Sequence, residues 1–293
     1  MTTPLEYLLT VILPTFFYGL TFGAVYGLIA LGLTIICGVT GVIHFAHGHV
    51  AMLAAYIGFT ILTVFVPNFP VAILVVIGII TVFGCFIERG LCRPLYGRPP
   101  LLIFVVTWGL ALFLRDFVLF TWGSYPIVIR EPVTGILFGI PTFRLVILAV
   151  CLAVFIGLWL FFNKTKYGSI IRATTEDSSM AACLGINVPR VKLAVFALSS
   201  AVAGLAAMLA LPLAALTPEV GSMIILWCFY IVIIGGMGSI GGSILAAFLL
   251  GQVIALGSIW FEPREMEILS FALILAVLAI RPRGFFGRPL LLE

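Results

Sequence analysis

The chain consists largely of long apolar runs separated by short polar segments. Of its 293 residues, 63% are hydrophobic and 9% are charged, whereas a soluble globular domain carries about 25% charged residues. Because bilayer hydrocarbon is about 30 Å thick, one helical span needs about 20 mostly apolar residues. The sequence therefore predicts an all-α, polytopic membrane protein with about eight to ten transmembrane helices. We expect one transmembrane domain over 1–293, since the longest polar segment, about 163–190, is too short for a separate core.

Nine apolar runs can be drawn along the chain. They cover Leu8 to Ile36, Val50 to Val66, Val71 to Ile87, Leu101 to Thr121, Leu145 to Phe162, Val191 to Leu216, Met223 to Ile234, Ile240 to Trp260 and Ile268 to Ile280. The first run is long enough for one tilted span or for a tight pair of helices. The sequence leaves both alternatives open, with nine spans in the first case and ten in the second.

Lysine and arginine are concentrated in three segments, at 89–98, 164–192 and 281–288. The positive-inside rule places all three on the cytoplasmic side. An even number of spans must then separate the second segment from the third, which predicts a break at GGMGSIGG, Gly235 to Gly242. The run before it would reach only about 18 Å at 1.5 Å per residue, so we expect a broken or re-entrant segment shielded by its neighbours. Segment 122–144 would form a cap on the outer side.

Several kinds of chemistry lack their residues in this chain. No GxxxxGK[ST] motif occurs, so the chain does not bind ATP by a P-loop, and HExxH and GxSxG are also missing. The net charge is only +4, and the basic residues lie in loops, which points away from nucleic acid. We expect neither an enzyme nor a cofactor-binding protein, and any ATP-driven work would fall to a partner.

Ionisable residues near the apolar runs are few. The clearest are Arg115 with Asp116, and Glu219 after Pro218. All three lie near predicted span ends, which favours interfacial charges that reach water. This placement weakens an ion-coupling role, which carriers usually give to ionisable groups at membrane depth.

The polar segment at 163–190 contains a candidate docking helix. We expect Thr175 to cap a short helix with two acidic residues in its first turn, which the helix dipole favours. A small apolar face would point outward to a partner protein, and a glycine would end the helix. These residues are, in order, Glu176 and Asp177, then Ala181, Ala182 and Leu184, and finally Gly185.

The AAxxGI pattern in this segment resembles the EAA-type coupling loop with which ABC importer permeases dock onto their ATPase subunits. Longer stretches extend the likeness. They are GLIALGLTIICGVTGVIHFAHGHVAMLAAY, GRPPLLIFVVTWGLALFLRD, RATTEDSSMAACLGINVPRVKLAVFALSSAVAGLAAML, VIIGGMGSIGGSILAAFLLG and RPRGFFG. Over nearly its whole length the chain resembles the branched-chain amino acid (LivH/LivM-type) ABC permeases.

This resemblance implies a multi-pass, lipid-embedded subunit of an importer in a bacterial-type inner membrane. Its partners would be a homologous second permease, most simply in a heterodimer, two ABC ATPase subunits that use ATP, and an extracytoplasmic solute-binding protein. The residues that match the coupling region are Glu176, Asp177, Ala181, Ala182 and Gly185. Branched-chain or other hydrophobic amino acids are the favoured substrates, with urea, amides or a small aromatic acid as alternatives. A stand-alone secondary transporter is the more distant alternative, since it would not need a docking helix.

The glycine cluster has two readings. Small residues allow helices to pack closely in lipid, or they form a hinge near the inner end of the pathway. The glycines concerned are Gly235, Gly236, Gly238, Gly241 and Gly242. In the span at 101–121, Thr107 and Trp108 are candidates to face the pathway, although a tryptophan is as often a packing residue.

The stretch GVIHFAHGH contains all three histidines of the chain, His44, His47 and His49. A zinc site would need all three, and structural sites usually take four ligands, so we expect no metal site here. Members of the resembled family commonly show VINFAHGE here, so His47 and Gly48 match whereas the other two histidines depart from the pattern. We expect His44 to His49, including Phe45, to form an irregular polar segment that lines or braces the pathway, with a helix break at Gly48.

Overall fold

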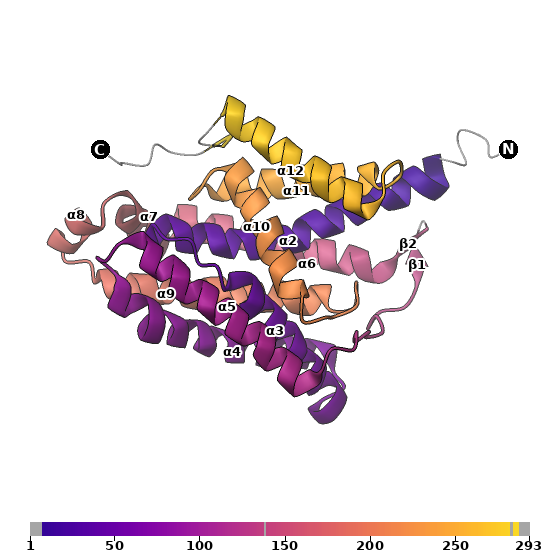
Figure 1. The fold of residues 1–293 in the computed structure, drawn as a ribbon, viewed down its shortest axis with the longest axis horizontal. Helices are drawn as coiled ribbons and strands as arrows, with labels where there is room; N and C mark the ends of the chain where they lie inside the picture. Colours follow the sequence, from indigo (N-terminus) through magenta and orange to yellow (C-terminus); the bar gives the residue numbers. More distant parts are fainter. Residues whose placement is uncertain (1–7, 138, 282–283, 287–293) are drawn as a thin grey trace.

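The computed structural model describes residues 8–137, 139–281 and 284–286, and it shows a bundle of helices that run roughly side by side (Figure 1). Helices α7 and α8 lie at one end of the bundle, and the short hairpin β1–β2 lies at the other. The tail motif RPRGFFG falls partly outside the described residues, as do Arg283 and Arg288 of the third basic segment.

The helices follow the predicted apolar runs, with additional short elements at the ends. In chain order they are η1 (Leu8–Ile12), α2 (Leu13–Thr40), α3 (His47–Thr60), η2 (Ile61–Phe65), α4 (Phe69–Ile87), η3 (Glu88–Cys92), η4 (Arg93–Leu95), α5 (Pro100–Trp122), β1 (Ile136–Leu137), β2 (Ile140–Pro141), α6 (Thr142–Lys164), α7 (Lys166–Glu176), α8 (Ser178–Cys183), α9 (Val188–Ala210), α10 (Val220–Gly235), α11 (Ile240–Gly257) and α12 (Pro263–Ile280).

Seven of the described helices are long and apolar enough to cross a membrane. The first predicted run forms one continuous helix, η1 with α2, and not a tight pair. The predicted break in the late apolar stretch is confirmed, because α10 ends at Gly235 and α11 begins at Ile240. Helix α10 is shorter than a full span, as its sequence indicates.

Local sequence signals explain where several helices begin. Asn68 caps α4 by accepting a hydrogen bond from the backbone N–H of Val71, and Pro70 follows in the first turn. Asn187 caps α9 in the same way, with Pro189 in its first turn. Ser239 caps α11 through the N–H of Gly242. Polar residues therefore set the start of otherwise featureless apolar helices.

Helix α2 lies at the centre of the bundle and packs against α6, α9, α10 and α11. Its contact with α11 is a close backbone contact, because a Cβ atom on Gly23 would lie 2.7 Å from the carbonyl oxygen of Ala247. Two hydrogen bonds also join the helices: the hydroxyls of Thr34 and Ser243 lie 2.7 Å apart, and the amide of Gln252 donates to the carbonyl of Phe16 at 3.0 Å. Small residues thus allow helices to approach closely where lipid offers no hydrophobic driving force.

Candidate functional site

The predicted coupling segment folds as two helices, α7 and α8, at one end of the bundle (Figure 1). The prediction that Thr175 caps the docking helix is wrong, because Thr175 lies inside α7 and its hydroxyl donates to the carbonyl of Ile171. Glu176 is the last residue of α7 and not part of a first turn. Asp177 is the cap of α8, since its Oδ1 accepts from the N–H groups of Ser179 and Met180, both at 2.8 Å. The cap of the docking helix therefore lies two residues later than expected.

The predicted stop at Gly185 is confirmed. Gly185 has a φ of +84°, which glycine adopts without the penalty that a side chain brings. Its N–H donates to the carbonyl of Ala182, and the N–H of Ile186 donates to the carbonyl of Ala181. This pair of bonds is the Schellman arrangement, which satisfies the last carbonyls of a helix.

The face that α8 presents outward differs in one residue from the expected face. Ala181 is only 2% exposed, so the prediction that it points outward is wrong: it is the residue through which α8 packs on the protein. Ala182 and Leu184 are exposed, the latter at 74%, and Met180 joins them. The acidic residues before them are also exposed. This end of the bundle therefore exposes a small apolar surface on α8 with acidic residues beside it.

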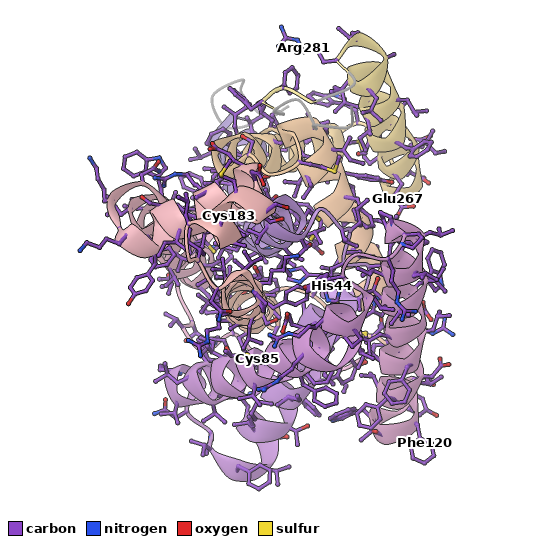
Figure 2. All side chains as sticks on the ribbon, turned by 90° about the vertical axis from the view of Figure 1, so that its left-hand side faces the viewer. His44, Cys85, Phe120, Cys183, Glu267 and Arg281 are labelled. Carbon is purple, nitrogen blue, oxygen red and sulfur yellow. The ribbon has the colours of Figure 1, made fainter. Side chains whose placement is uncertain are left out.

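The irregular segment near the histidines lies about three residues earlier in the chain than the predicted segment, His44 to His49. Helix α2 ends at Thr40 and is followed by its cap Gly41, which has a φ of +67°, and α3 begins at His47. Gly48 lies inside α3, so the predicted helix break there is wrong, and the irregular segment is 41–46. Figure 2 shows His44 near the middle of the bundle in a view along its length.

The three histidine side chains are buried but do not converge. Nε2 of His47 lies 3.1 Å from the carbonyl oxygen of Ile29, whereas Nε2 of His49 lies 3.4 Å from the hydroxyl of Ser222. The ring centroids of His44 and His47 are 6.0 Å apart. Within the described residues, no three His, Cys, Asp or Glu side chains could hold one metal ion. His47 and His49 therefore contact α2 and α10 separately.

Gly48 is the point where α3 meets α10. A Cβ atom on Gly48 would lie 2.5 Å from the carbonyl oxygen of Gly221 and 2.6 Å from the backbone nitrogen of Ile225. A Cβ atom on Gly221 would in turn lie 2.8 Å from the His49 ring. Because the contacts of Gly48 are with backbone atoms, it cannot be replaced without moving a helix, whereas a side chain at Gly221 would first meet the His49 ring.

The structure brings Phe45, Thr107 and Trp108 together, although they are distant in sequence. The backbone N–H of Phe45 donates to the hydroxyl of Thr107 at 3.2 Å, and the Phe45 ring stacks on Trp108 with centroids 4.6 Å apart. Phe229 of α10 and Phe104 complete the aromatic cluster. Thr107 is buried, whereas Trp108 is 44% exposed. The cluster thus joins the irregular segment to α5 and keeps one aromatic face open.

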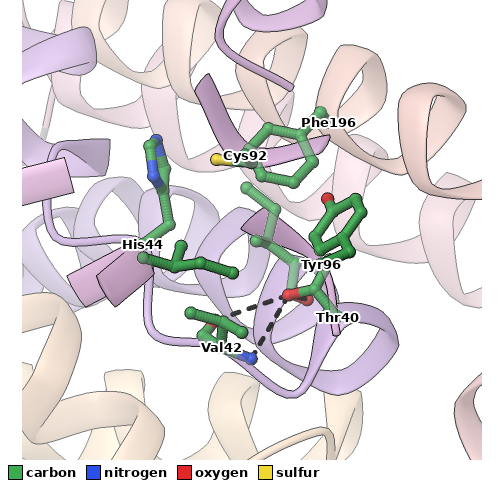
Figure 3. Close-up of a pocket in the computed structure, with 8 residues that line it drawn as sticks. Thr40, Val42, His44, Cys92, Tyr96 and Phe196 are labelled. Carbon is green, nitrogen blue, oxygen red and sulfur yellow. Dashed lines mark hydrogen bonds between the residues drawn. The ribbon is translucent and has the colours of Figure 1, made fainter. Parts of the chain in front are cut away.

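A small cavity lies beside His44 (Figure 3). Its lining residues are Ile36, Thr40, Val42, His44, Cys92, Tyr96, Ile103 and Phe196. Its volume is about 10 Å³, roughly what one water molecule requires. An amino acid does not fit there, so this cavity is not a substrate chamber in the conformation observed.

One polar cluster was not foreseen from the sequence. Glu88 is fully buried, and Arg93 donates to both of its carboxylate oxygens, at 3.1 and 2.8 Å. Arg93 also donates to the carbonyl of Pro189 at 3.3 Å, and the ammonium of Lys192 lies 3.9 Å from the centre of the Tyr96 ring. The cluster ties the end of α4 to the start of α9, immediately after α8. The one sequence signal was a glutamate at the end of an apolar run with an arginine five residues later.

The glycine cluster forms the turn between α10 and α11. Gly236 and Gly238 have φ values of +94° and +81°, which L side chains rarely adopt. Gly235 and Gly242 face each other, since a Cβ atom on Gly235 would lie 2.6 Å from the backbone of Gly242. Gly241 faces open space. Turn geometry and close packing therefore account for four of the five glycines, and the hinge role stays a prediction.

Comparison with known proteins identifies relatives over almost the whole chain. A family model described as "Branched-chain amino acid transport system / permease component" matches residues 15–278. BraD of Pseudomonas aeruginosa, a high-affinity branched-chain amino acid transport system permease protein, is 34% identical over 92% of this chain and 94% of its own length.

Two further relatives have similar names. LivH of Escherichia coli K12, a high-affinity branched-chain amino acid transport system permease protein, is 32% identical over 93% of this chain and 94% of its own. A probable branched-chain amino acid transport permease protein LivH of Methanocaldococcus jannaschii is 28% identical over 89% and 88%. No solved structure matches the chain significantly.

Proposed function

The chain belongs to the family of branched-chain amino acid transport system permease components, and we propose that it is the membrane-spanning subunit of an ATP-binding cassette importer. It is a multi-pass helical protein of the inner membrane. The family is one of transport permeases and not of enzymes. The observation that carries the proposal is the exposed helix α8 at the end of the bundle where basic residues collect.

The proposed partners follow from this division of labour. Two ABC ATPase subunits would hydrolyse ATP, since the chain has no P-loop, and one of them would bind α8. A homologous second permease would complete the pathway, and an extracytoplasmic binding protein would deliver the substrate. The apolar side chains of Met180, Ala182 and Leu184 would enter a groove on the ATPase, with Glu176 and Asp177 at its rim. We propose no cofactor for this chain itself.

The contacts of α8 suggest how its movement would reach the pathway. Helix α8 is joined to α9 by the Gly185 turn, and α9 packs against α2, α3 and α4. The bond from Arg93 to the carbonyl of Pro189 ties the first turn of α9 to the segment before α5. Closure of the ATPases would thus move α9 and the segment before α5 together, and the bundle would alternate between two access states.

We propose a branched-chain amino acid as the substrate, on the strength of the relatives' names and of the aromatic cluster around Phe45 and Trp108. Urea, an amide or a small aromatic acid is the alternative. The test is uptake of labelled leucine and labelled urea by cells that express the complete transporter. We expect leucine uptake that unlabelled isoleucine and valine suppress; uptake of urea alone would overturn the substrate.

A further inference from the structure

Three charged side chains lie together on α5 and at the start of α10. Nε of Arg115 donates to Oδ1 of Asp116 at 3.1 Å, and Nη1 of Arg115 lies 3.8 Å from Oε1 of Glu219. The second distance is too long for a hydrogen bond. The side chains of Arg115, Asp116 and Glu219 are 35%, 63% and 67% exposed. They form an open cluster and not a closed ion pair.

The depth of this cluster argues against purely interfacial charges. Arg115 lies seven residues before the end of α5 at Trp122, which is about 10 Å along a helix. Arginine could reach the interface from there, but the short side chain of Asp116 could not. Glu219 directly precedes a short helix whose second residue, Gly221, touches the His49 ring region. Charges at such depth face a water-filled space or another protein chain and not lipid.

The surroundings of the cluster match one kind of small molecule. Trp108 lies seven residues before Arg115, and thus on the same face of α5. Its open aromatic surface belongs to the cluster with Phe45. On α10, Met223 and Leu226 lie four and seven residues after Glu219 and are about half exposed; with Trp227, Tyr230 and Glu267 they line a pocket of about 90 Å³. A polar group with both signs of charge is therefore followed, in the inward direction, by apolar and aromatic surface.

We propose that Arg115, Asp116 and Glu219 form the first binding site for the charged head group of the amino acid inside the membrane. The guanidinium of Arg115, whose Nε donates to Asp116, would bind the α-carboxylate through its Nη atoms, and the two carboxylates would bind the α-ammonium. The apolar side chain would then point inward, toward Trp108 on the same face of α5. This proposal rests on the proposed substrate class, because only a zwitterion uses both signs of charge.

The test is uptake of labelled leucine into proteoliposomes that contain the complete transporter, with saturating binding protein and ATP. We expect Arg115→Gln and Glu219→Gln each to reduce the uptake rate per assembled complex by about tenfold or more, as for loss of one charge-assisted contact. Arg144→Gln is the matched control, since Arg144 lies near the same end of the bundle but contacts Tyr18 instead. If Arg115→Gln does not assemble, Glu219→Gln carries the test, because its side chain is mostly exposed.

A charge-reversal pair separates substrate binding from a structural ion pair. The double variant Arg115→Glu/Glu219→Arg restores an ion pair across α5 and α10 but reverses the arrangement around Asp116. We expect it to remain as slow as the single variants. Recovery of uptake in the double variant would overturn the proposal. So would a loss of affinity for the binding protein in the single variants that matches their loss of uptake, because the cluster would then be a docking surface. Urea transport by the wild type would refute the substrate class, whereas normal leucine uptake by both single variants would refute only this site.

Discussion

Ala182→Asp on α8 separates docking from folding. The methyl group of Ala182 is exposed and its neighbour Ala181 is buried, so a charge at position 182 meets water in the isolated chain. We expect the free energy of unfolding to change by no more than about 0.5 kcal/mol, as for ordinary surface substitutions. In the assembled transporter the same carboxylate would be buried without a partner in an apolar groove.

The size of the docking defect follows from that burial. An uncompensated charge in an interface costs about 3–5 kcal/mol, and each 1.4 kcal/mol is about a factor of ten in affinity. We therefore expect the ATPase to bind Ala182→Asp at least about 100-fold more weakly than it binds the wild type. ATP-dependent uptake should fall in parallel.

The assay combines three readings on the same preparation. These are the thermal unfolding midpoint of the chain in detergent, its affinity for the purified ATPase, and uptake by the complete transporter. Ala181→Asp is the contrasting variant, because its charge would enter the protein and lower the unfolding midpoint itself. Gly185→Glu is less informative, since a side chain at a φ of +84° adds strain of about 1–2 kcal/mol. If Ala182→Asp binds the ATPase and transports normally, α8 is not the docking element.

The remaining predictions concern stability and are checked by thermal unfolding of the purified chain in detergent. Arg93→Met should destabilise the protein by about 3–5 kcal/mol because it leaves the buried carboxylate of Glu88 unpaired. Glu88→Gln should cost less, since Arg93 is partly exposed and can reach water. Equal losses of stability in the two variants would contradict this account of the pair. Gly48→Ala should cost at least about 1–3 kcal/mol and disturb the contact between α3 and α10, and an unchanged midpoint would mean that the helices can separate freely. Gly235→Ala should lower the stability by a similar amount, and Gly241→Ala should leave it nearly unchanged. If both variants are equally stable and Gly241→Ala loses transport, the hinge role of the glycines is favoured instead.

The pattern of spans could be predicted because it depends on local properties of the sequence, namely the length and hydrophobicity of each run. Apolar runs of bilayer length and clusters of lysine and arginine gave the helices and the break after Gly235, and no long-range contact was needed for either. Helix ends were harder, because Thr175 and Asp177 are both competent caps. The choice between them depended on where α7 packs, which the sequence does not state.

Side-chain partners across the bundle could not be predicted in the same way. Phe45 and Thr107 were proposed separately as pathway residues, and only the fold shows that they share a hydrogen bond. Glu88 was overlooked because a single glutamate at a span end usually faces water, whereas here Arg93 and a turn of irregular helix bury it. The three histidines are close in sequence, but only the fold shows that His47 contacts α2 and His49 contacts α10.

The most direct test of the central claim is accumulation of leucine by proteoliposomes that contain this chain, its second permease and the ATPases, with binding protein outside and ATP inside. The account predicts accumulation against a gradient that requires both ATP and the binding protein and that persists when ionophores remove proton and sodium gradients. Accumulation without ATP, driven by an ion gradient, would show a secondary transporter and contradict the account.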